Sequence, residues 1–164
     1  MNNTHHTLQT RIETPLGPMT ATRSAKGLSG LWFEGQKHHT DLADVPSGHD
    51  ALFDQLAAGL TRYFDGGELP ELPLDPQGTA FQQDVWKALL DIDLGRVDSY
   101  GALARRIGRP QAVRALGAAV GRNPISILIP CHRVLGATGE LTGYAGGLER
   151  KKAMLTLEGV PYKQ

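Results

Sequence analysis

The chain has 164 residues, of which 40% are hydrophobic and 21% charged, and its formal net charge is zero. This length fits one domain or two small ones, and the ordinary composition, without a long apolar run, predicts a soluble globular protein and excludes a membrane-spanning one. The single cysteine cannot form an internal disulfide, which fits a reducing cytoplasm, and residues 1–17 lack the basic and apolar regions of a secretory signal.

The first elements in chain order are a predicted β-meander and a helix. Three segments alternate apolar and polar residues and are separated by turns that contain glycine: residues 7–14, 18–24 and 28–34. In residues 50–64, leucine and phenylalanine recur every four positions, which predicts a helix that stops at Gly66. Residues 65–78 contain three prolines and three glycines without an apolar period, so we predict a linker there.

A capping box opens the second half of the chain. Thr79 and Gln82 have its spacing, and they precede a helix with an apolar stripe. Phe81 and Trp86 belong to that stripe and are expected to be core residues rather than contact residues.

Two short helices joined by a tight turn are predicted next. Ser99 can cap a helix that breaks at residues 108–110. Residues 111–122 then resume a helix that must end at Asn123-Pro124, because the residue before a proline disfavours helical geometry. This pattern is typical of a helix-turn-helix.

The charge is distributed unevenly along the chain. Residues 1–78 carry five basic and ten acidic side chains, whereas residues 79–164 carry twelve and seven. Residues 96–133 hold seven arginines and a single acid, Asp98. Such a local basic surface suits phosphate contacts, whose affinity depends on local rather than overall charge. A solvated face without a nucleic-acid partner is the alternative.

The second of the two short helices is built mainly from small residues, namely Ala112, Ala115, Gly117, Ala118 and Ala119. One long cation, Arg114, projects from among them. Small side chains let a helix approach a partner closely, and an arginine there can fill the gap that an extruded base leaves in a duplex. The alternative is that the small residues pack on a neighbouring helix and that Arg114 is solvated.

A possible reactive centre follows. The apolar run 125–129 is too short for a helix and rich in β-branched residues, so we expect a short strand that delivers Pro130-Cys131-His132-Arg133. Free cysteine has a pKa of about 8.5, and a neighbouring histidine and arginine would raise its thiolate fraction. A lone cysteine after a hydrophobic strand is also compatible with a small buried hydrophobe.

The segment LIPCHRV at 128–134 resembles the active-site signature of the O6-alkylguanine-DNA alkyltransferases. Its companions occur in order: Tyr100, Arg114, Asn123-Pro124, TGYAGG at 142–147 and LEG at 157–159. The resemblance covers residues 79–160 closely, and the N-terminal part more loosely through residues 14–19 and 63–66. Within the family the chain looks most like the bacterial constitutive form. No run of further zinc-ligand cysteines is present, so we expect neither a zinc-bearing N-terminal domain nor an adaptive-response sensor domain.

The resemblance implies a catalytic role for five residues. Cys131 would be the nucleophile, His132 its base through an intervening water, and Glu158 the group that holds the imidazole. Asn123 would bridge the end of the recognition helix to the active-site segment. Tyr100 would crowd a phosphate so that the nucleotide rotates out, and would donate a hydrogen bond toward N3 of the flipped guanine.

The resemblance also implies the substrate and DNA contacts. Arg114 would replace the lost base in the stack, and its helix would contact DNA through Ala112, Val113, Ala115 and Gly117. The carbonyl of Val134 would accept from the guanine amine, Tyr144 would form a wall of the pocket, and the Ala145 amide would point at O6. Serine is frequent at that last position in the family, so alanine leaves only the backbone donor.

The predicted fold is α+β. Residues 1–77 are expected to form an N-terminal α/β domain with a small, ribonuclease H-like β-sheet. Residues 78–164 are expected to form a mainly helical, winged-helix-like domain that contains the helix-turn-helix, binds DNA and carries the alkyl transfer.

The function implied is stoichiometric transfer of an alkyl group from O6-alkylguanine in duplex DNA to Cys131 after base flipping, with approach from the minor-groove side. The protein would act as a monomer, without a metal or cofactor and away from membranes, and the thioether product would consume it after one turnover. Whether O4-alkylthymine is also repaired stays open. The pairs His5-His6 and His38-His39 lack partners at ligand spacing, so we expect ordinary surface histidines.

Two functions of other classes remain as alternatives. The first is a non-catalytic lesion-binding or regulatory module, which the intact Cys131 disfavours. The second is a cysteine hydrolase built on Cys131 and His132, which the missing oxyanion framework and the arginine-rich helix disfavour.

Overall fold

The computed structural model describes residues 5–164. These residues form two compact units. The first unit comprises the chain up to Gln77 together with Pro124–Leu128, and the second comprises Gly78–Asn123 and Ile129–Gln164. Among residues 5–164, no helix has both the length and the apolar character needed to cross a bilayer.

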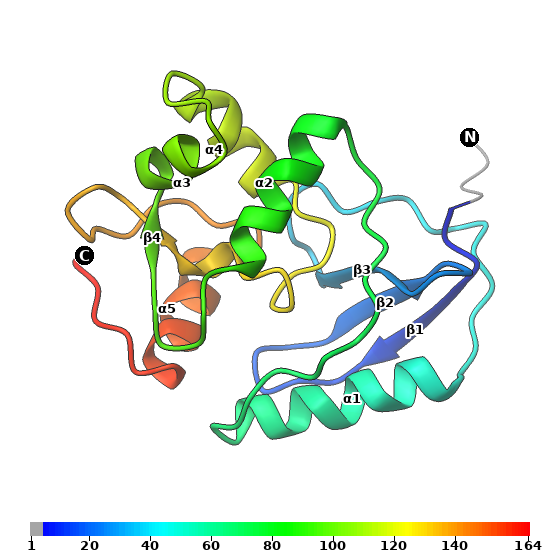
Figure 1. Cartoon of the computed structure of the whole chain (residues 1–164). Coiled ribbons are helices and arrows are strands. Elements are labelled where there is room, and N and C mark those ends of the chain that lie inside the picture. The colour runs from blue at the N-terminus through cyan, green and yellow to red at the C-terminus, as the bar shows by residue number, and fades with distance from the viewer. Residues whose placement is uncertain (1–4) are drawn as a thin grey trace. The chain divides into compact units, whose positions relative to one another are not determined.

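A three-stranded antiparallel sheet forms the centre of the first unit, in the order β1 (Leu8–Ile12), β2 (Met19–Arg23) and β3 (Leu28–Phe33). The predicted meander is therefore confirmed. Helix α1 (Ala51–Phe64) runs along one side of this sheet (Figure 1). The Asp50 side chain caps it by accepting from the Phe53 amide, and its leucines at four-residue spacing are buried.

The apolar run after Pro124 does not form the predicted strand. It makes one bridge to the sheet, in which the Leu31 amide donates to the Pro124 carbonyl at 2.8 Å and the Ser126 amide donates to the Leu31 carbonyl at 2.9 Å. Ile127 then adopts a φ of 74°, a left-handed conformation that is rare for a β-branched residue and ends the extended path. Burial explains the hydrophobicity of this segment, which is therefore no evidence for a strand.

Helices dominate the second unit. They are α2 (Ala80–Leu90), α3 (Tyr100–Arg106), α4 (Val113–Gly121) and α5 (Leu148–Leu157). Thr79 and Gln82 form both hydrogen bonds of the predicted capping box. Trp86 is buried and donates from Nε1 to the Ala119 carbonyl at 2.9 Å, as expected of a core residue. Phe81 is only half-buried, so the prediction of a core position is wrong for this residue, and the guanidinium of Arg109 lies over its ring at 5.7 Å from the centroid.

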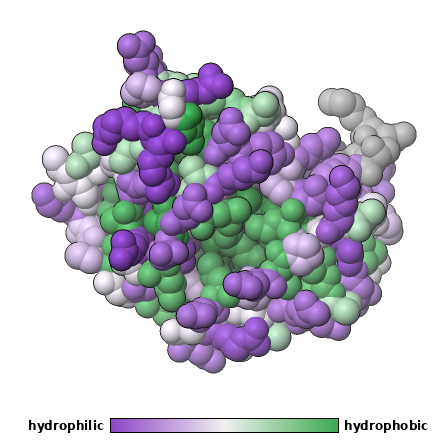
Figure 2. All heavy atoms as spheres, in the orientation of Figure 1, coloured by the Kyte–Doolittle hydropathy of each residue, from purple (hydrophilic) through white to green (hydrophobic). Residues whose placement is uncertain are grey.

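Helices α3 and α4 form the predicted helix-turn-helix. The Ser99 side chain accepts from the Ala102 amide and so caps α3, and Gly108 takes a φ of 75° in the turn that follows. Helix α4 begins at Val113, later than the predicted start at residue 111, and Ala112 provides no side-chain cap. Figure 2 shows strongly hydrophilic side chains over the region of α3 and α4.

The remaining strands of the second unit are short. β4 (Asp98–Ser99) pairs in parallel with β5 (Val134–Leu135), so the residue that caps α3 is hydrogen-bonded to the strand that follows the cysteine segment. The cysteine itself begins a single 3₁₀ turn, η1 (Cys131–Arg133). Local backbone pairing thus brings the start of α3 beside the Cys131 region.

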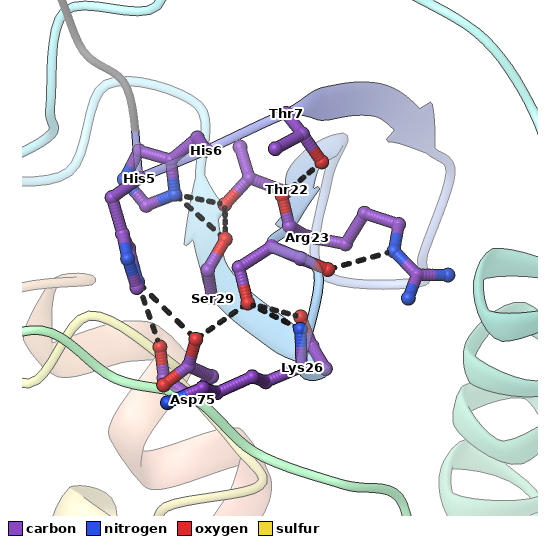
Figure 3. Close-up of polar contacts among 10 residues, drawn as sticks. His5, His6, Thr7, Thr22, Arg23, Lys26, Ser29 and Asp75 are labelled. Atoms are coloured by element: carbon purple, nitrogen blue, oxygen red, sulfur yellow. Dashed lines mark hydrogen bonds and ion pairs between the residues drawn. The ribbon is translucent and has the colours of Figure 1, made fainter.

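One histidine of the first unit is not at the surface as predicted. His6 is 8% exposed, and its Nδ1 lies 2.6 Å from Ser29 Oγ and 3.1 Å from Thr22 Oγ1 (Figure 3). His5 is half-buried and bonds the Asp75 carbonyl through Nε2, whereas His38 and His39 are exposed. A hydrogen-bonded pocket for His6 requires residues distant in sequence, so no local pattern predicts it.

We expect the stability of the first unit to fall as the pH drops below about 6.5. Burial, aided by the charge of His5, lowers the pKa of His6 to about 4, so folding favours the neutral ring. The contribution is present above the unfolded-state value and is lost between pH 6.5 and about 4, which amounts to roughly 3 kcal/mol. Urea unfolding at a series of pH values measures it.

His6→Gln should flatten this part of the profile, because the titrating ring is gone. His49→Gln is the matched control, since His49 is exposed in the same unit. An unchanged slope in His6→Gln would assign the pH dependence to other groups.

Candidate functional site

Cys131, the only cysteine of the chain, is 5% exposed. The side-chain amide of Asn123, just beyond α4, donates to the Ile129 carbonyl at 2.7 Å and lies 3.1 Å from Cys131 Sγ. One buried side chain therefore joins the end of the helix-turn-helix to the thiol. The family resemblance predicts a bridging role for Asn123, and this role stays a prediction.

Opposing electrostatic effects act on the pKa of the Cys131 thiol. Burial raises the pKa of Cys131 above its usual value, while the hydrogen bond from Asn123, the positive charge of Lys151 and an interaction with Tyr144 lower it. We expected a neighbouring histidine and arginine to favour the thiolate. The arginine does not do so, because Arg133 is engaged elsewhere, and a buried thiol needs a base to take its proton.

His132 and Arg133 both bind one buried carboxylate. His132 Nε2 lies 2.6 Å from Glu158 Oε2, and Arg133 Nε donates to Glu158 Oε1 at 2.7 Å. The side chains of His132 and Glu158 are 0% and 1% exposed. Arg133 also donates from Nη1 to the Ile92 carbonyl at 2.7 Å. Glu158, the C-cap residue of α5, thus orients the imidazole that follows Cys131.

The imidazole of His132 has the properties of a neutral base. Burial lowers the pKa of His132, although the hydrogen bond and charge of Glu158 oppose that effect. A carboxylate accepts hydrogen bonds, so the ring proton belongs on Nε2 and the lone pair on Nδ1. Nδ1 is buried and has no hydrogen-bond partner within residues 5–164. An acceptor is therefore available on the ring adjacent to Cys131 in the chain.

Lys151 is a part of the site that sequence reasoning missed. It is fully buried in α5, and its ammonium donates to the Val134 carbonyl at 2.7 Å, to Thr142 Oγ1 at 3.0 Å and to the Thr142 carbonyl at 3.3 Å. Burial lowers the pKa of Lys151 to about 8, and the Cys131 thiolate opposes the shift. Its neighbours in sequence are mostly charged, so the pattern LERKKAML gives no sign that this lysine is buried.

The hydroxyl of Tyr100 lies within the same network. Tyr100 Oη is 2.8 Å from Thr142 Oγ1, and burial raises the pKa of the phenol. The phenol therefore keeps its proton at neutral pH. Tyr100 is the first residue of α3, so the β4–β5 pairing and the Ser99 cap position this side chain.

The remaining predicted substrate residues lie around this network. Val134 is buried, and its carbonyl accepts from Lys151. Tyr144 and Ala145 are half-buried in the irregular segment that precedes α5. Gly147, the N-cap of α5, has a φ of 95°, which a residue with a side chain rarely adopts.

Helix α4 presents part of its small-residue set to solvent. Val113, Arg114, Ala115 and Ala118 are exposed, Ala112 and Gly117 are half-buried, and only Leu116, Ala119 and Val120 are buried. The interpretation that the whole small-residue set packs on a neighbouring helix is therefore wrong for Ala115 and Ala118, whereas Ala119 is buried and Gly117 faces the ring of Tyr100 on α3. All arginines of residues 96–133 except Arg133 are exposed, so the basic stretch contributes to the surface.

Models of two protein domains match the chain. The DNA binding domain of 6-O-methylguanine DNA methyltransferase matches residues 80–160, and the ribonuclease-like domain of the same family matches residues 7–76.

Curated relatives agree with this family. A methylated-DNA--protein-cysteine methyltransferase of Haemophilus influenzae is 43% identical over 159 residues, which is 93% of this chain and 87% of the relative. A relative of the same name from Mycobacterium bovis is 47% identical over 152 residues, covering 90% and 89% of the two chains. Among solved structures, Mycobacterium tuberculosis OGT in complex with DNA superposes with a TM-score of 0.85 at 43% identity, covering 92% of each chain.

Proposed function

Since the chain belongs to the 6-O-methylguanine DNA methyltransferase family, we propose that it repairs duplex DNA by moving an alkyl group from O6 of guanine to Cys131. The observation that carries the proposal is that the sole cysteine is followed directly in the chain by a buried histidine whose Nε2 lies 2.6 Å from the buried carboxylate of Glu158. Residues 78–164 act as the DNA-binding and alkyl-transfer domain, and residues 1–77 support it. The protein works as a monomer in the cytoplasm, where its thiol stays reduced.

Proton removal from Cys131 is the first step. The free Nδ1 of His132 accepts the thiol proton through an intervening water, while Glu158 stabilises the resulting charge on the ring. Arg133, which shares Glu158, keeps that carboxylate in place. The positive charge of Lys151 favours the thiolate as it forms.

Alkyl transfer follows as a direct displacement. The thiolate sulfur bonds to the alkyl carbon, and the carbon–O6 bond breaks with its electron pair moving onto guanine. Guanine takes up a proton in place of the alkyl group, so the sum is a thiol and an alkylguanine giving a thioether and guanine. Thioethers lack an easy leaving path in water, and the protein is consumed after one turnover.

The flipped base is held by groups around the Lys151 network. Tyr100 donates toward N3 of guanine, the Ala145 amide points at O6, and Tyr144 forms the wall. The Val134 carbonyl accepts from the guanine amine with the lone pair that Lys151 leaves unused. Each donor stabilises the negative charge that develops on the departing base.

Helix α4 approaches the duplex from the minor-groove side. Its exposed small residues allow close contact, and the exposed Arg114 enters the base stack in place of the flipped guanine. Contacts come from Ala112, Val113, Ala115 and Gly117. The exposed arginines of α3 and of the turn neutralise phosphates.

Intact-mass measurement tests the proposal. Incubation with an O6-methylguanine duplex should add one methyl group to the protein, mapped to Cys131, in a one-to-one ratio with repaired guanine. No mass gain despite DNA binding would favour a lesion-binding module, and repeated turnover of an ester or amide would favour a hydrolase. A parallel O4-methylthymine duplex tests that second substrate.

Arg114→Ala should slow transfer from duplex DNA by roughly 10- to 100-fold. Base extrusion costs a few kcal/mol, and without Arg114 the gap left in the base stack is no longer filled, so part of this free energy is no longer offset. Affinity for undamaged duplex should change far less, since the neighbouring arginines still contact phosphates. Single-turnover kinetics and fluorescence anisotropy measure the two quantities. Arg122→Ala, another exposed arginine at the end of α4, is the control. A normal transfer rate in Arg114→Ala would refute the role of this side chain.

A further inference from the structure

A chain of hydrogen bonds leads from a buried ammonium to the hydroxyl of Tyr100. Lys151 Nζ is 3.0 Å from Thr142 Oγ1, which is 2.8 Å from Tyr100 Oη. Lys151 is fully buried, whereas Thr142 and Tyr100 are half-buried. The three residues come from α5, the segment before it and the start of α3, so Thr142 is the only link between the lysine and the phenol in this chain of contacts.

The chemistry of these groups allows a chain of donors that runs from Lys151 through Thr142 to Tyr100. An ammonium can only donate, so Thr142 Oγ1 accepts from Lys151. The hydroxyl proton of Thr142 therefore cannot go to Lys151, whose other contacts are the carbonyls of Val134 and Thr142. That proton is available for Tyr100 Oη. When Tyr100 accepts it, the phenolic proton remains free for a group outside the network.

We infer that Thr142 is a positioning residue that donates to Tyr100 and so leaves the phenolic proton of Tyr100 free to be donated to the flipped guanine. The inference rests on the alkyl-transfer function proposed above. Lys151 polarises the Thr142 hydroxyl, which strengthens its donation to Tyr100 and makes the phenol a better donor in turn. A donor already oriented before the base arrives needs no reorganisation as guanine departs.

The opposite arrangement has a different consequence. A threonine oxygen has two lone pairs, so it can also accept from both Lys151 and Tyr100. In that case the phenolic proton would be held inside the protein, and the contact with Thr142 would have to break before guanine could be protonated. Removal of the Thr142 hydroxyl would then leave transfer unchanged or make it faster.

Thr142→Val and Thr142→Ser separate these cases. Valine keeps the shape and removes the hydroxyl, and we expect it to slow single-turnover methyl transfer from O6-methylguanine DNA by about tenfold, the effect of one hydrogen bond. Serine keeps the hydroxyl and should restore most of the rate. Thr142→Ala is a second hydroxyl-free variant that cannot overpack the site.

A merely structural role is distinguished by two further measurements. In a Tyr100→Phe background, Thr142→Val should have no further effect on the transfer rate, because Thr142 acts through the phenol. Alkylation of Cys131 by iodoacetamide should proceed at the wild-type rate in Thr142→Val, since Lys151 keeps both carbonyl partners.

Three outcomes would overturn the inference: transfer by Thr142→Val at or above the wild-type rate, an equal loss in Thr142→Ser, or a further loss in the Tyr100→Phe background. Failure of the proposed function itself would look different, because the wild-type protein would then gain no methyl group.

Discussion

Cys131→Ala is expected to abolish methyl transfer to the protein while leaving its affinity for an O6-methylguanine duplex close to the wild-type value. The chain has no other thiol, so no second residue can form the thioether. The exposed residues of α4 and the surrounding arginines, which we propose to bind DNA, are untouched by this change. Intact-mass analysis measures transfer, and fluorescence anisotropy measures affinity.

Cys131→Ser is the matched control for the size of the side chain. It preserves the contacts of the buried sulfur position approximately, but an alcohol is far harder to ionise than a thiol, so we expect no transfer by this variant either. A methyl group found on any residue of Cys131→Ala would contradict the assignment of the nucleophile. A large loss of DNA affinity in both variants would instead indicate that the cysteine segment shapes the binding surface.

Glu158→Gln should both destabilise the protein and slow transfer. The Glu158 side chain is 1% exposed and accepts hydrogen bonds from His132 and Arg133 at 2.6 and 2.7 Å. A glutamine would place its NH2 group, which can only donate, against the donor of His132 or of Arg133. Breaking such a buried pair costs about 3–5 kcal/mol. Loss of the oriented base should reduce the transfer rate by on the order of 10²–10⁴. Urea unfolding and single-turnover kinetics measure the two effects.

Glu149→Gln provides the comparison on the same helix. The Glu149 side chain is 89% exposed and pairs with Lys152 at 3.3 Å, and an exposed pair of this kind contributes little to stability. We expect both its unfolding and its transfer rate to match the wild type. If Glu158→Gln retained wild-type stability and rate, the carboxylate would have no part in orienting His132.

The groups that surround the Cys131 thiol have opposite effects on its ionisation. Burial opposes ionisation, and the neighbouring arginine is committed to Glu158 and to the Ile92 carbonyl. We therefore propose that activation depends on His132, whose pKa burial lowers, and on the charge of Lys151, which lowers the pKa of Cys131, rather than on the neighbouring arginine. A reactive cysteine that is kept protonated until a base removes its proton is also protected from casual oxidation.

Much of the fold could be predicted because its signals are local. The capping box at Thr79, the Ser99 cap and the turns between the three strands each act over a few residues, and the structure contains the caps and the three-stranded meander. The predicted strand at residues 125–129 fails because an apolar run reports burial, and burial does not require an extended ladder.

In the candidate site, too, some features follow from local sequence motifs and others do not. The order of motifs around Cys131 is enough to predict a nucleophile, its base and the helix that would meet DNA, and it indicates the family that the comparisons show. The burial of Lys151 and His6 escapes any periodicity, because the carbonyls and hydroxyls that satisfy them come from segments far away in the chain.

By itself, then, the sequence predicts most of the helical and sheet elements and the uneven distribution of charge, since these depend on neighbouring residues, whereas the reactive cysteine is identified by the resemblance of its segment to a known family. Only the tertiary structure decides that Arg133 serves Glu158 and not the thiol, and that Lys151, Thr142 and Tyr100 form one network. The physical reason is that a buried charge takes whichever partners the packed chain brings within hydrogen-bonding distance.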